Sequence, residues 1–346
     1  FRLKVALVEI VEDEEVTEAE ENPEDSETVI EEETIDEFPE QGSVNTVIIF
    51  RDSAFGNASI KSIGRQNLLK AFENCDAVFA AGFQGISSDG FVTTLGRGGS
   101  DTTAAALAAA FGAERCEIYT DVDGVKTADP KSYPKAMLME SLDYREMGEM
   151  ASEGAKVLHT RCVEIAGKHS LRLFVKNSFS DAPGTEIALD SSDKRPFKGF
   201  VHKSAVCDFC ADYSMVNNAK KRQRALFEIL AAKGISLDMI NICGKKTYFS
   251  VSEKDSPSVK RYFEAAGLKY SEISGCAKLS CIGSGMKGAP GVMALAFGAL
   301  SEAGINVFRI LDSFINISFL IKESDTEAAL EALHKIMVLT PEGGIC

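Results

Sequence analysis

The sequence lacks the features that mark membrane, exported or nucleic-acid-binding proteins. No apolar run approaches the length of a membrane-spanning helix, and the first residues do not look like a secretory signal. No basic stripe stands out, so nothing favours binding to nucleic acid. The nine cysteines are an odd number without framework spacing, which predicts reduced thiols in a cytoplasmic protein.

A metal site is also poorly supported by the cysteine pattern. Cys207 and Cys210 form a lone CxxC, without a second pair at zinc spacing. Along a strand their side chains would point to opposite faces of the sheet. We therefore predict no metal site there.

Basic residues are absent from one long acidic stretch. Residues 9–40 contain 17 Asp and Glu and no Lys or Arg, whereas the rest of the chain carries 35 acidic and 37 basic residues. The net charge of −15 therefore belongs to this stretch, and the remaining body is nearly neutral. Because the stretch has no sustained apolar period, residues 1–42 are predicted to be a disordered segment. The alternative is an interaction tail for a basic partner.

The rest of the chain alternates strand-like and helix-like patterns, which is typical of an α/β domain followed by smaller modules. The stretch at 181–199 is rich in Asp, Ser, Pro, Gly and Lys, which is typical of a linker. The predicted strands are 44–50, 76–82, 116–120 and 171–176, and the predicted helices are 63–74, 101–111, 143–151 and 155–168.

An internal repeat follows the linker. FEILAAKGISLDMI at 227–240 aligns with FGALSEAGINVFRI at 297–310, with an offset of 70 residues. Each copy predicts a strand, a helix ending in glycine, two strands and a second helix. Two copies are too few for a solenoid, so we interpret them as a pair of compact α+β modules.

The stretch TTLGRGGSDTT at 93–103 is suited to an anion. Its glycines let backbone N–H groups approach a ligand closely, and the start of a helix adds partial positive charge. Arg97 adds a planar donor fork that matches a carboxylate or a phosphate. A tight structural turn, with Asp101 as a helix cap, is the alternative for this stretch.

A second polar loop follows the strand at 116–120. Ligands of α/β sheets bind beyond the carboxyl ends of strands, and DVDGVKTADP begins there. Its carboxylates and lysines suit Mg²⁺ and phosphates, although a polar turn would have a similar composition. Lys156, in EGAKVLHTR, is predicted at a helix start, and His159 is predicted to be a packed or capping residue.

Together these motifs resemble one family. TTLGRGGSDTTA, YTDVDGVKTADP, GAKVLHTR and FSDAPGT, followed by two 70-residue repeats, look like aspartate kinase over about residues 44–340. The resemblance implies an αβα sandwich of the amino acid kinase type, incomplete here, followed by two α+β modules of the ACT type (βαββαβ). The implied limits are 43–190 for the kinase part, 191–204 for a linker, and 205–272 and 273–341 for the modules.

The resemblance also implies the reaction and its site. ATP with Mg²⁺ would phosphorylate the side-chain carboxylate of L-aspartate, the first step towards lysine, threonine, methionine and diaminopimelate. By position, Arg97 and Ser100 match residues that contact aspartate, and Asp101 matches one that orients a catalytic lysine. The positions implied to contact the nucleotide are Thr120, Asp121, Lys126, Lys131, Lys156 and Val157.

Three departures from the family pattern leave alternatives open. The expected Lys-Phe-Gly-Gly motif is not found in a chain that opens on Phe1, which predicts a record incomplete at its N-terminus. Lys126 and Lys131 stand where tyrosine and arginine are usual, and the first module has MVNNAKKRQ where a Pro-Gly loop is usual. The alternative to a feedback-regulated kinase is a non-catalytic, amino-acid-binding regulatory chain or an inactive fragment.

The resemblance further implies partners. Modules of the ACT type pair between chains, so a homo-oligomer is expected. The effector implied by family habit is lysine, with threonine and diaminopimelate left open.

Overall fold

The computed structural model describes most of the chain beyond the acidic stretch. The described residues are 5–9, 49–51, 59–72, 78, 80–87, 91–191, 193, 195–286 and 289–339. They form two compact units, which are treated separately below. The first unit comprises residues 1–124, 140–144 and 156–190, and the second comprises 125–139, 145–155 and 191–346. Most of the predicted disordered segment 1–42 lies outside the described residues. The prediction was wrong for residues 5–9, which form a strand that pairs antiparallel with residues 115–119.

The first unit is built from short strands and three helices. Its helices are α1 (Gln66–Phe72), α2 (Gly99–Ala110) and α4 (Thr160–Lys168). Its strands are β1 (Val5–Glu9), β2 (Ile49–Arg51), β3 (Ile60–Ile63), β4 (Gln84–Ser87), β5 (Val92–Thr94), β6 (Arg115–Thr120), β7 (Ser141–Asp143), β8 (Arg172–Asn177) and β9 (Thr185–Ala188).

A five-stranded mixed sheet carries the centre of this unit. Its strand order is β1-β6-β8-β9-β7, and its central strands β6 and β8 are parallel. Ile118, Leu173 and Val175 are fully buried or nearly so, in agreement with the apolar character that predicted strands at 116–120 and 171–176. The predicted α/β class is therefore confirmed. One detail differs, because β9 lies inside the stretch that was read as a linker and pairs with β7 and β8.

A four-stranded sheet, ordered β3-β2-β4-β5, completes the first unit. The prediction of a strand at 76–82 was wrong for the residues that are described there, because the strand begins two residues later, at Gln84. The small apolar residues before it suggested a strand, but Phe83 adopts a left-handed φ of 71° that interrupts extended backbone. Of the strand predicted at 44–50, only 49–50 fall within the described residues.

The second unit contains the predicted repeat. Its first copy consists of β10 (Gly199–Asp212), α5 (Ala219–Ala232), β11 (Asp238–Cys243), β12 (Lys246–Ser252), η1 (Glu253–Asp255) and α6 (Ser256–Ala265). Its second copy consists of β13 (Lys269–Ile282), η2 (Ser284–Met286), α7 (Val292–Glu302), β14 (Arg309–Asp312), β15 (Asn316–Lys322), η3 (Glu323–Asp325) and α8 (Thr326–Leu339). The helix α3 (Tyr144–Glu153) also belongs to this unit from its second residue on.

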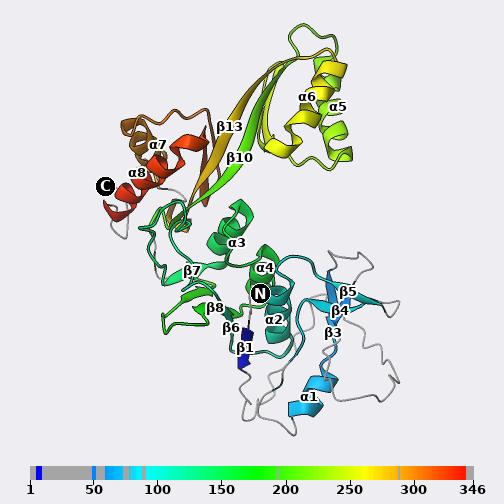
Figure 1. Cartoon of the computed structure of the whole chain (residues 1–346), viewed down its shortest axis with the longest axis vertical. Helices are drawn as coiled ribbons and strands as arrows, with labels where there is room; N and C mark the ends of the chain where they lie inside the picture. The colour runs from blue at the N-terminus through cyan, green and yellow to red at the C-terminus, as the bar shows by residue number, and fades with distance from the viewer. Residues whose placement is uncertain are drawn as a thin grey trace, which may run out of the picture. The chain divides into compact units, whose positions relative to one another are not determined.

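The two copies share one six-stranded sheet, ordered β11-β12-β10-β13-β15-β14. Figure 1 shows the long strands β10 and β13 side by side, with α5 and α6 at one end and α7 and α8 at the other. Gly234 and Gly304 follow α5 and α7 with φ of +69° and +74°, the left-handed conformation that ends a helix. The predicted order of elements is confirmed in both copies.

The turn before the first helix of each copy keeps the same backbone handedness despite the different sequences. Asn218 precedes α5 with a φ of 59°, and Gly291 precedes α7 with a φ of 93°. Asparagine is one of the few non-glycine residues that tolerate this region. Loss of the usual glycine from the first module therefore does not remove the left-handed turn.

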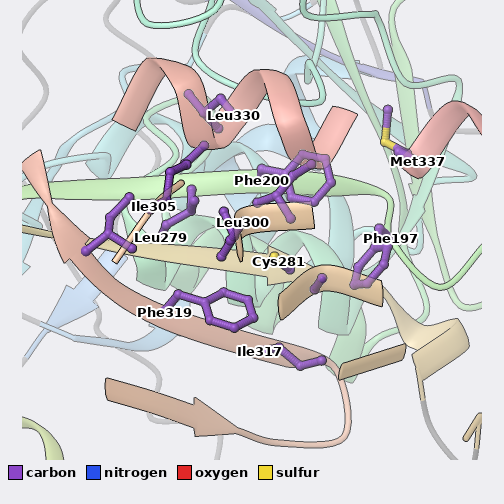
Figure 2. Packing of buried hydrophobic residues seen from close by; sticks show 14 of the residues in the cluster. Phe197, Phe200, Leu279, Cys281, Leu300, Ile305, Ile317, Phe319, Leu330 and Met337 are labelled. Atoms are coloured by element: carbon purple, nitrogen blue, oxygen red, sulfur yellow. The ribbon is translucent and has the colours of Figure 1, made fainter. Parts of the chain in front are cut away.

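The hydrophobic core of the second module lies between its helices and the sheet. Figure 2 shows Leu330 of α8 and Leu300 of α7 close to the sheet residues Leu279 and Phe319, and all four side chains are fully buried. Burying such side chains contributes about 1.5–3 kcal/mol each. Phe200, from the start of β10, enters the same cluster. From Gly199 on, the predicted linker 191–204 is therefore part of a core strand.

Helix α3 contacts the rest of the second unit through three glutamates whose spacing places them on one side of the helix. Glu146 accepts from Lys198 Nζ at 2.8 Å, and Glu153 accepts from Lys278 Nζ at 2.8 Å. Between them, Glu149 accepts from Asn316 Nδ2 at 2.7 Å. Positions i, i+3 and i+7 share one side of a helix, so all three carboxylates face the sheet. Helix α3 is thus anchored to the repeat by charge.

One of these pairs also involves the edge of the sheet. Lys278 Nζ donates to Asp238 Oδ2 at 2.9 Å, at the start of β11. Burial lowers the pKa of Lys278, but its hydrogen bonds to Glu153 and Asp238 outweigh burial and leave the pKa above its ordinary value. Lys278 therefore remains charged and joins α3 to the first copy of the repeat.

Candidate functional site

The glycine loop leads directly into helix α2, as its sequence predicts. Gly96 and Gly98 both adopt left-handed φ angles, +77° and +68°, on either side of Arg97. Gly98 is the N-cap of α2, and no side chain caps the helix there. The first amides of α2 therefore have no side-chain cap, which suits a helix N-terminus that meets an anion.

Neighbouring hydrogen bonds hold this loop in place. Thr102 Oγ1 donates to Gly98 O at 2.9 Å, and Thr103 Oγ1 donates to Gly99 O at 2.8 Å. The backbone N–H of Phe83 donates to Thr103 Oγ1 at 3.1 Å. These bonds tie the start of α2 to the segment before β4, so the loop is preorganised.

The structure brings two of the sequence motifs together at Gly98. A Cβ added at Gly98 would lie 2.3 Å from Cβ of His159, so only glycine fits. His159 is the N-cap of α4, and its Nδ1 accepts from the backbone N–H of Arg161 at 3.3 Å. The prediction that His159 is a packed or capping residue is confirmed. It is also the contact through which GAKVLHTR meets GRGGS.

One local prediction about this region was wrong. Lys156 does not begin a helix, because α4 begins at Thr160, after the His159 cap. Asp101 lies in the first turn of α2 and is 2% exposed. Its carboxylate lies near β6: burial raises the pKa of the Cys116 thiol to about 12, and Asp101 and Glu117 add to this rise.

The two predicted aspartate contacts flank the N-terminus of α2. Arg97 is exposed, and Ser100 is half-buried in the first turn. Within the part of the chain that the structure describes, no carboxylate forms an ion pair with Arg97, so its guanidinium is available to a ligand. Residues 80–83 lie beside Ser100, since a Cβ on Gly82 would be 3.7 Å from Ser100 Oγ. Residues 80–82, which were predicted to belong to a strand, instead lie beside this loop.

Two predicted nucleotide residues, Thr120 and Asp121, lie at the carboxyl ends of the central strands of the five-stranded sheet. Thr120 and Asn177 are the last residues of the parallel strands β6 and β8 and are register partners. Ser178 N donates to Thr120 O at 2.8 Å, and Thr120 Oγ1 donates to Asp121 Oδ1 at 3.1 Å. The carboxyl ends of parallel strands are where α/β proteins bind ligands.

Sequence reasoning missed two members of this cluster. Asn177 Nδ2 donates to Asp123 Oδ1 at 2.7 Å, and Ser180 Oγ donates to the same oxygen at 3.2 Å. Ser180 belongs to the stretch FSDAPGT, which served only as a family marker, and Asn177 lies two residues before it. The sequence signal that could have identified them is their position at, or just after, the end of β8, a strand that runs parallel to β6.

The cluster fits a magnesium nucleotide in its donor chemistry. Mg²⁺ is usually held by one or two carboxylates together with substrate phosphates. Asp121 is exposed and Asp123 is half-buried, so this edge offers two carboxylates beside hydroxyl and amide groups. Among the described residues, no group of three or more His, Cys, Asp and Glu forms a metal site by itself.

The remaining nucleotide predictions are divided between the units. Lys156 and Val157 lie in the first unit, before the His159 cap, with Lys156 exposed. Lys126 and Lys131 lie in the second unit, in a loop that follows Gly124. Thr120 and Asp121 precede that boundary in the chain.

Lys131 also lines a polar hollow of the second unit. The backbone N–H of Lys131 donates to Asp129 Oδ1 at 2.9 Å, which forms a local turn. Glu323 of η3 and Glu327 in the first turn of α8 line the same hollow together with His202. These carboxylates would repel phosphates, so the hollow itself is a poor nucleotide pocket.

None of the described helices has the length and apolar character needed to cross a membrane.

Two families match the sequence. The amino acid kinase family matches residues 4–177, and the ACT domain matches residues 279–337. The chain is 39% identical over 296 residues to an aspartokinase of Mycolicibacterium smegmatis, covering 81% of this chain and 70% of that protein.

Solved structures are similar as well. Aspartokinase III of E. coli in complex with aspartate and ADP has a TM-score of 0.69 and 28% identity, with 83% of this chain and 67% of that chain covered. The complex of the same enzyme with lysine and aspartate also has a TM-score of 0.69, with 27% identity and 84% and 67% coverage. The first is described as an R-state and the second as a T-state.

Proposed function

Because the chain belongs to the aspartokinase branch of the amino acid kinase family, we propose that it transfers the γ-phosphoryl group of ATP to the side-chain carboxylate of L-aspartate. The product would be 4-phospho-L-aspartate. We also propose the domain limits given by the sequence for the kinase part, 43–190, and for the second module, 273–341. The proposed linker shortens from 191–204 to 191–198, and the first module begins at 199 instead of 205 and ends at 272, because β10 begins at Gly199. The proposed regulator is an end-product amino acid that binds the two modules.

The observation that carries the proposal is the backbone around Arg97. Left-handed Gly96 and Gly98 present the guanidinium at the start of α2, next to a helix end that no side chain caps. An anionic substrate with a carboxylate satisfies both features at once. Arg97 and Ser100 are therefore proposed to hold aspartate.

The proposed chemistry relies on positioning and charge. The aspartate carboxylate attacks the γ-phosphoryl group in line with the leaving oxygen, and no covalent intermediate with the chain is needed. Thr120 and Asp121 are proposed to hold the nucleotide, and Asp101 to orient a lysine. Mg²⁺ bound with ATP would neutralise phosphate charge. The proposed cationic and backbone contacts to the nucleotide are Lys126, Lys131, Lys156 and Val157.

An aspartyl-hydroxamate assay tests the function. The chain is incubated with ATP, Mg²⁺, aspartate and hydroxylamine, and the acyl phosphate is trapped as a coloured hydroxamate. We expect turnover, and we expect lysine to suppress it more strongly than threonine or diaminopimelate does. Protein that is folded by circular dichroism but gives no hydroxamate would instead favour a non-catalytic regulatory chain.

The edges of the repeat sheet support a proposed homo-oligomer. Strands β11 and β14 are its two outer strands, and Ile240 and Ile310 occupy equivalent positions there, 45% and 37% exposed. Ile242 and Leu311 extend this apolar surface, 54% and 42% exposed. Unpaired apolar edge strands are covered in stable proteins, and a second copy of the chain offers the same two edges.

Light scattering at micromolar concentration tests the oligomer. We expect a mass of at least two chains for the protein as purified. Replacing Ile240 and Ile310 together by aspartate is expected to shift the mass towards one chain, because charge would be buried at the edges. A wild-type monomer at that concentration would exclude the proposed pairing.

A further inference from the structure

A single loop of the second unit carries two of the proposed nucleotide lysines. We define the lysine loop as residues 126–137, which contains Lys126 and Lys131. A bridge between Lys126 and Leu138 closes its base, and Thr127 N donates to Met137 O at 2.9 Å. The loop follows Asp121 and Asp123 in the chain, but it is part of the compact unit that contains the repeat.

The lysine loop is attached to the core of the second module. Phe200 N donates to Thr127 O at 2.7 Å, so β10 begins with a hydrogen bond to the loop. Ala128 is 5% exposed and belongs to the same hydrophobic cluster as Phe200 and Leu330. Tyr133 packs against that cluster. The loop therefore depends on the module for its conformation, whereas an independent surface loop would not.

His334 of α8 contacts the loop by both its ring face and its ring nitrogen. Its ring stacks on Tyr133 with centroids 4.1 Å apart and an interplanar angle of 26°. Its Nε2 lies 3.0 Å from Thr127 Oγ1, and its Nδ1 lies 2.7 Å from Leu330 O. The ring is 4% exposed, and Phe200 packs against it edge-on at 4.9 Å.

The protonation of His334 follows from these partners. Leu330 O can only accept, so Nδ1 carries the proton and donates to it. In the neutral ring Nε2 is then an acceptor, and Thr127 Oγ1 donates to it while accepting from Met137 N at 3.0 Å. Burial lowers the pKa of His334, and this effect outweighs the hydrogen bond to Leu330, which acts to raise the pKa. The lowered pKa favours the neutral ring at neutral pH. Each polar atom of this chain of contacts has a compatible partner.

We propose that His334 is a positioning residue for the nucleotide: through Thr127 and Tyr133 it sets the conformation of the lysine loop, and so of Lys126 and Lys131. The inference rests on the proposed function, because it requires those lysines to contact ATP. It deepens that function by giving α8 of the second module a specific effect. A change in α8 alters nucleotide affinity and leaves aspartate affinity unchanged, since Arg97 and Ser100 belong to the first unit.

Two substitutions approach the contact from its two sides. His334→Phe keeps a ring against Tyr133 but removes both ring nitrogens, and Thr127→Val removes the hydroxyl from a side chain of similar shape. Each variant is expected to raise the Kd for ADP, and the KM for ATP, by about 3- to 30-fold. The double variant is expected to bind ADP at most about twofold more weakly than the weaker-binding single variant, because both substitutions break the same hydrogen bond between Thr127 and His334. The Kd and KM for aspartate are expected to change less than about twofold.

A matched control separates positioning from general loss of stability. Phe263, in α6 of the first module, is fully buried, and it packs against the rings of Phe209, Phe249, Tyr262 and Tyr270, none of which belongs to the lysine loop. Phe263→Leu is expected to lower the thermal midpoint at least as much as His334→Phe without changing the Kd for ADP. Calorimetry of ADP and aspartate binding, with circular dichroism for folding, provides all three readouts.

Three results would overturn the inference. The first is an unchanged Kd for ADP in folded His334→Phe and Thr127→Val. The second is an equal change in ADP and aspartate affinity in these variants, or an equal rise in the Kd for ADP in Phe263→Leu. Either outcome would indicate that His334 has a purely structural role. The third is an unchanged Kd for ADP in Lys126→Gln and Lys131→Gln. This last result would remove the nucleotide role of the loop, while hydroxamate turnover by the wild-type chain would leave the proposed kinase function intact.

Discussion

Replacing Arg97 by glutamine is expected to lower kcat/KM for aspartate by about 10- to 100-fold, because a charged hydrogen bond to a ligand contributes about 1.5–3 kcal/mol. The thermal midpoint should not change, since Arg97 is exposed and, within the described residues, forms no ion pair. Arg97→Lys should recover only part of the loss. Lysine keeps the charge but lacks the planar fork that matches a carboxylate.

Three measurements together make this prediction specific. Steady-state kinetics with each substrate varied gives the two KM values, and calorimetry gives the Kd for aspartate. Arg145→Gln is the control, because Arg145 is also exposed but lies at the start of α3, in the second unit, and is not among the predicted site residues. Equal losses in the Arg97 and Arg145 variants, or a loss confined to ATP, would contradict the assignment of Arg97 to aspartate.

The second large effect is expected at the buried pair Glu146–Lys198. Their side chains are 0% and 1% exposed, and Lys198 Nζ lies 2.8 Å from Glu146 Oε2 and 2.6 Å from Ser191 Oγ. Ser284 N donates to the other oxygen of Glu146 at 2.8 Å. Lys198→Met should lower the free energy of unfolding of the second unit by about 3–5 kcal/mol, because it leaves a carboxylate buried without its cation.

The double variant distinguishes a charge effect from a packing effect. Replacing both partners, as Glu146→Leu with Lys198→Met, should recover most of the lost stability, since no charge is then left unpaired. Scanning calorimetry can resolve the transition of the second unit from that of the first. Lys335→Met is the control: its pair with Glu331 is 3.4 Å long, and both side chains are more than half exposed. A double variant as unstable as Lys198→Met would show that the pair matters through packing alone.

Much of the fold could be predicted from the sequence because the signals are local. The helix at α2 follows from glycines and alanines in sequence, and the repeat follows from apolar residues recurring at a fixed offset. The parallel strands β6 and β8 were predicted as strands because each is a short run of mainly apolar residues. The glycines around Arg97 were expected to bring backbone close to an anion or to form a tight turn, because glycine adopts backbone that few other residues adopt.

The errors arose where a distant residue decided the outcome. Helix α4 begins at Thr160, later than predicted, because His159 caps it and packs on Gly98, a residue 61 positions earlier in the chain. Asn177 and Ser180 were missed because their shared partner, Asp123, lies more than 50 residues earlier. No local pattern reports such contacts.

The sequence by itself determined the family, the class of fold, the repeat and the glycine loop with its arginine, since these depend on chain neighbours and on recurring residue types. Tertiary structure alone decided that helix α3 and the lysine loop belong to the unit that contains the repeat. The physical reason is burial. Glu146 can be buried only where Lys198 meets it, and Thr127 is held where Phe200 and His334 supply its hydrogen bonds.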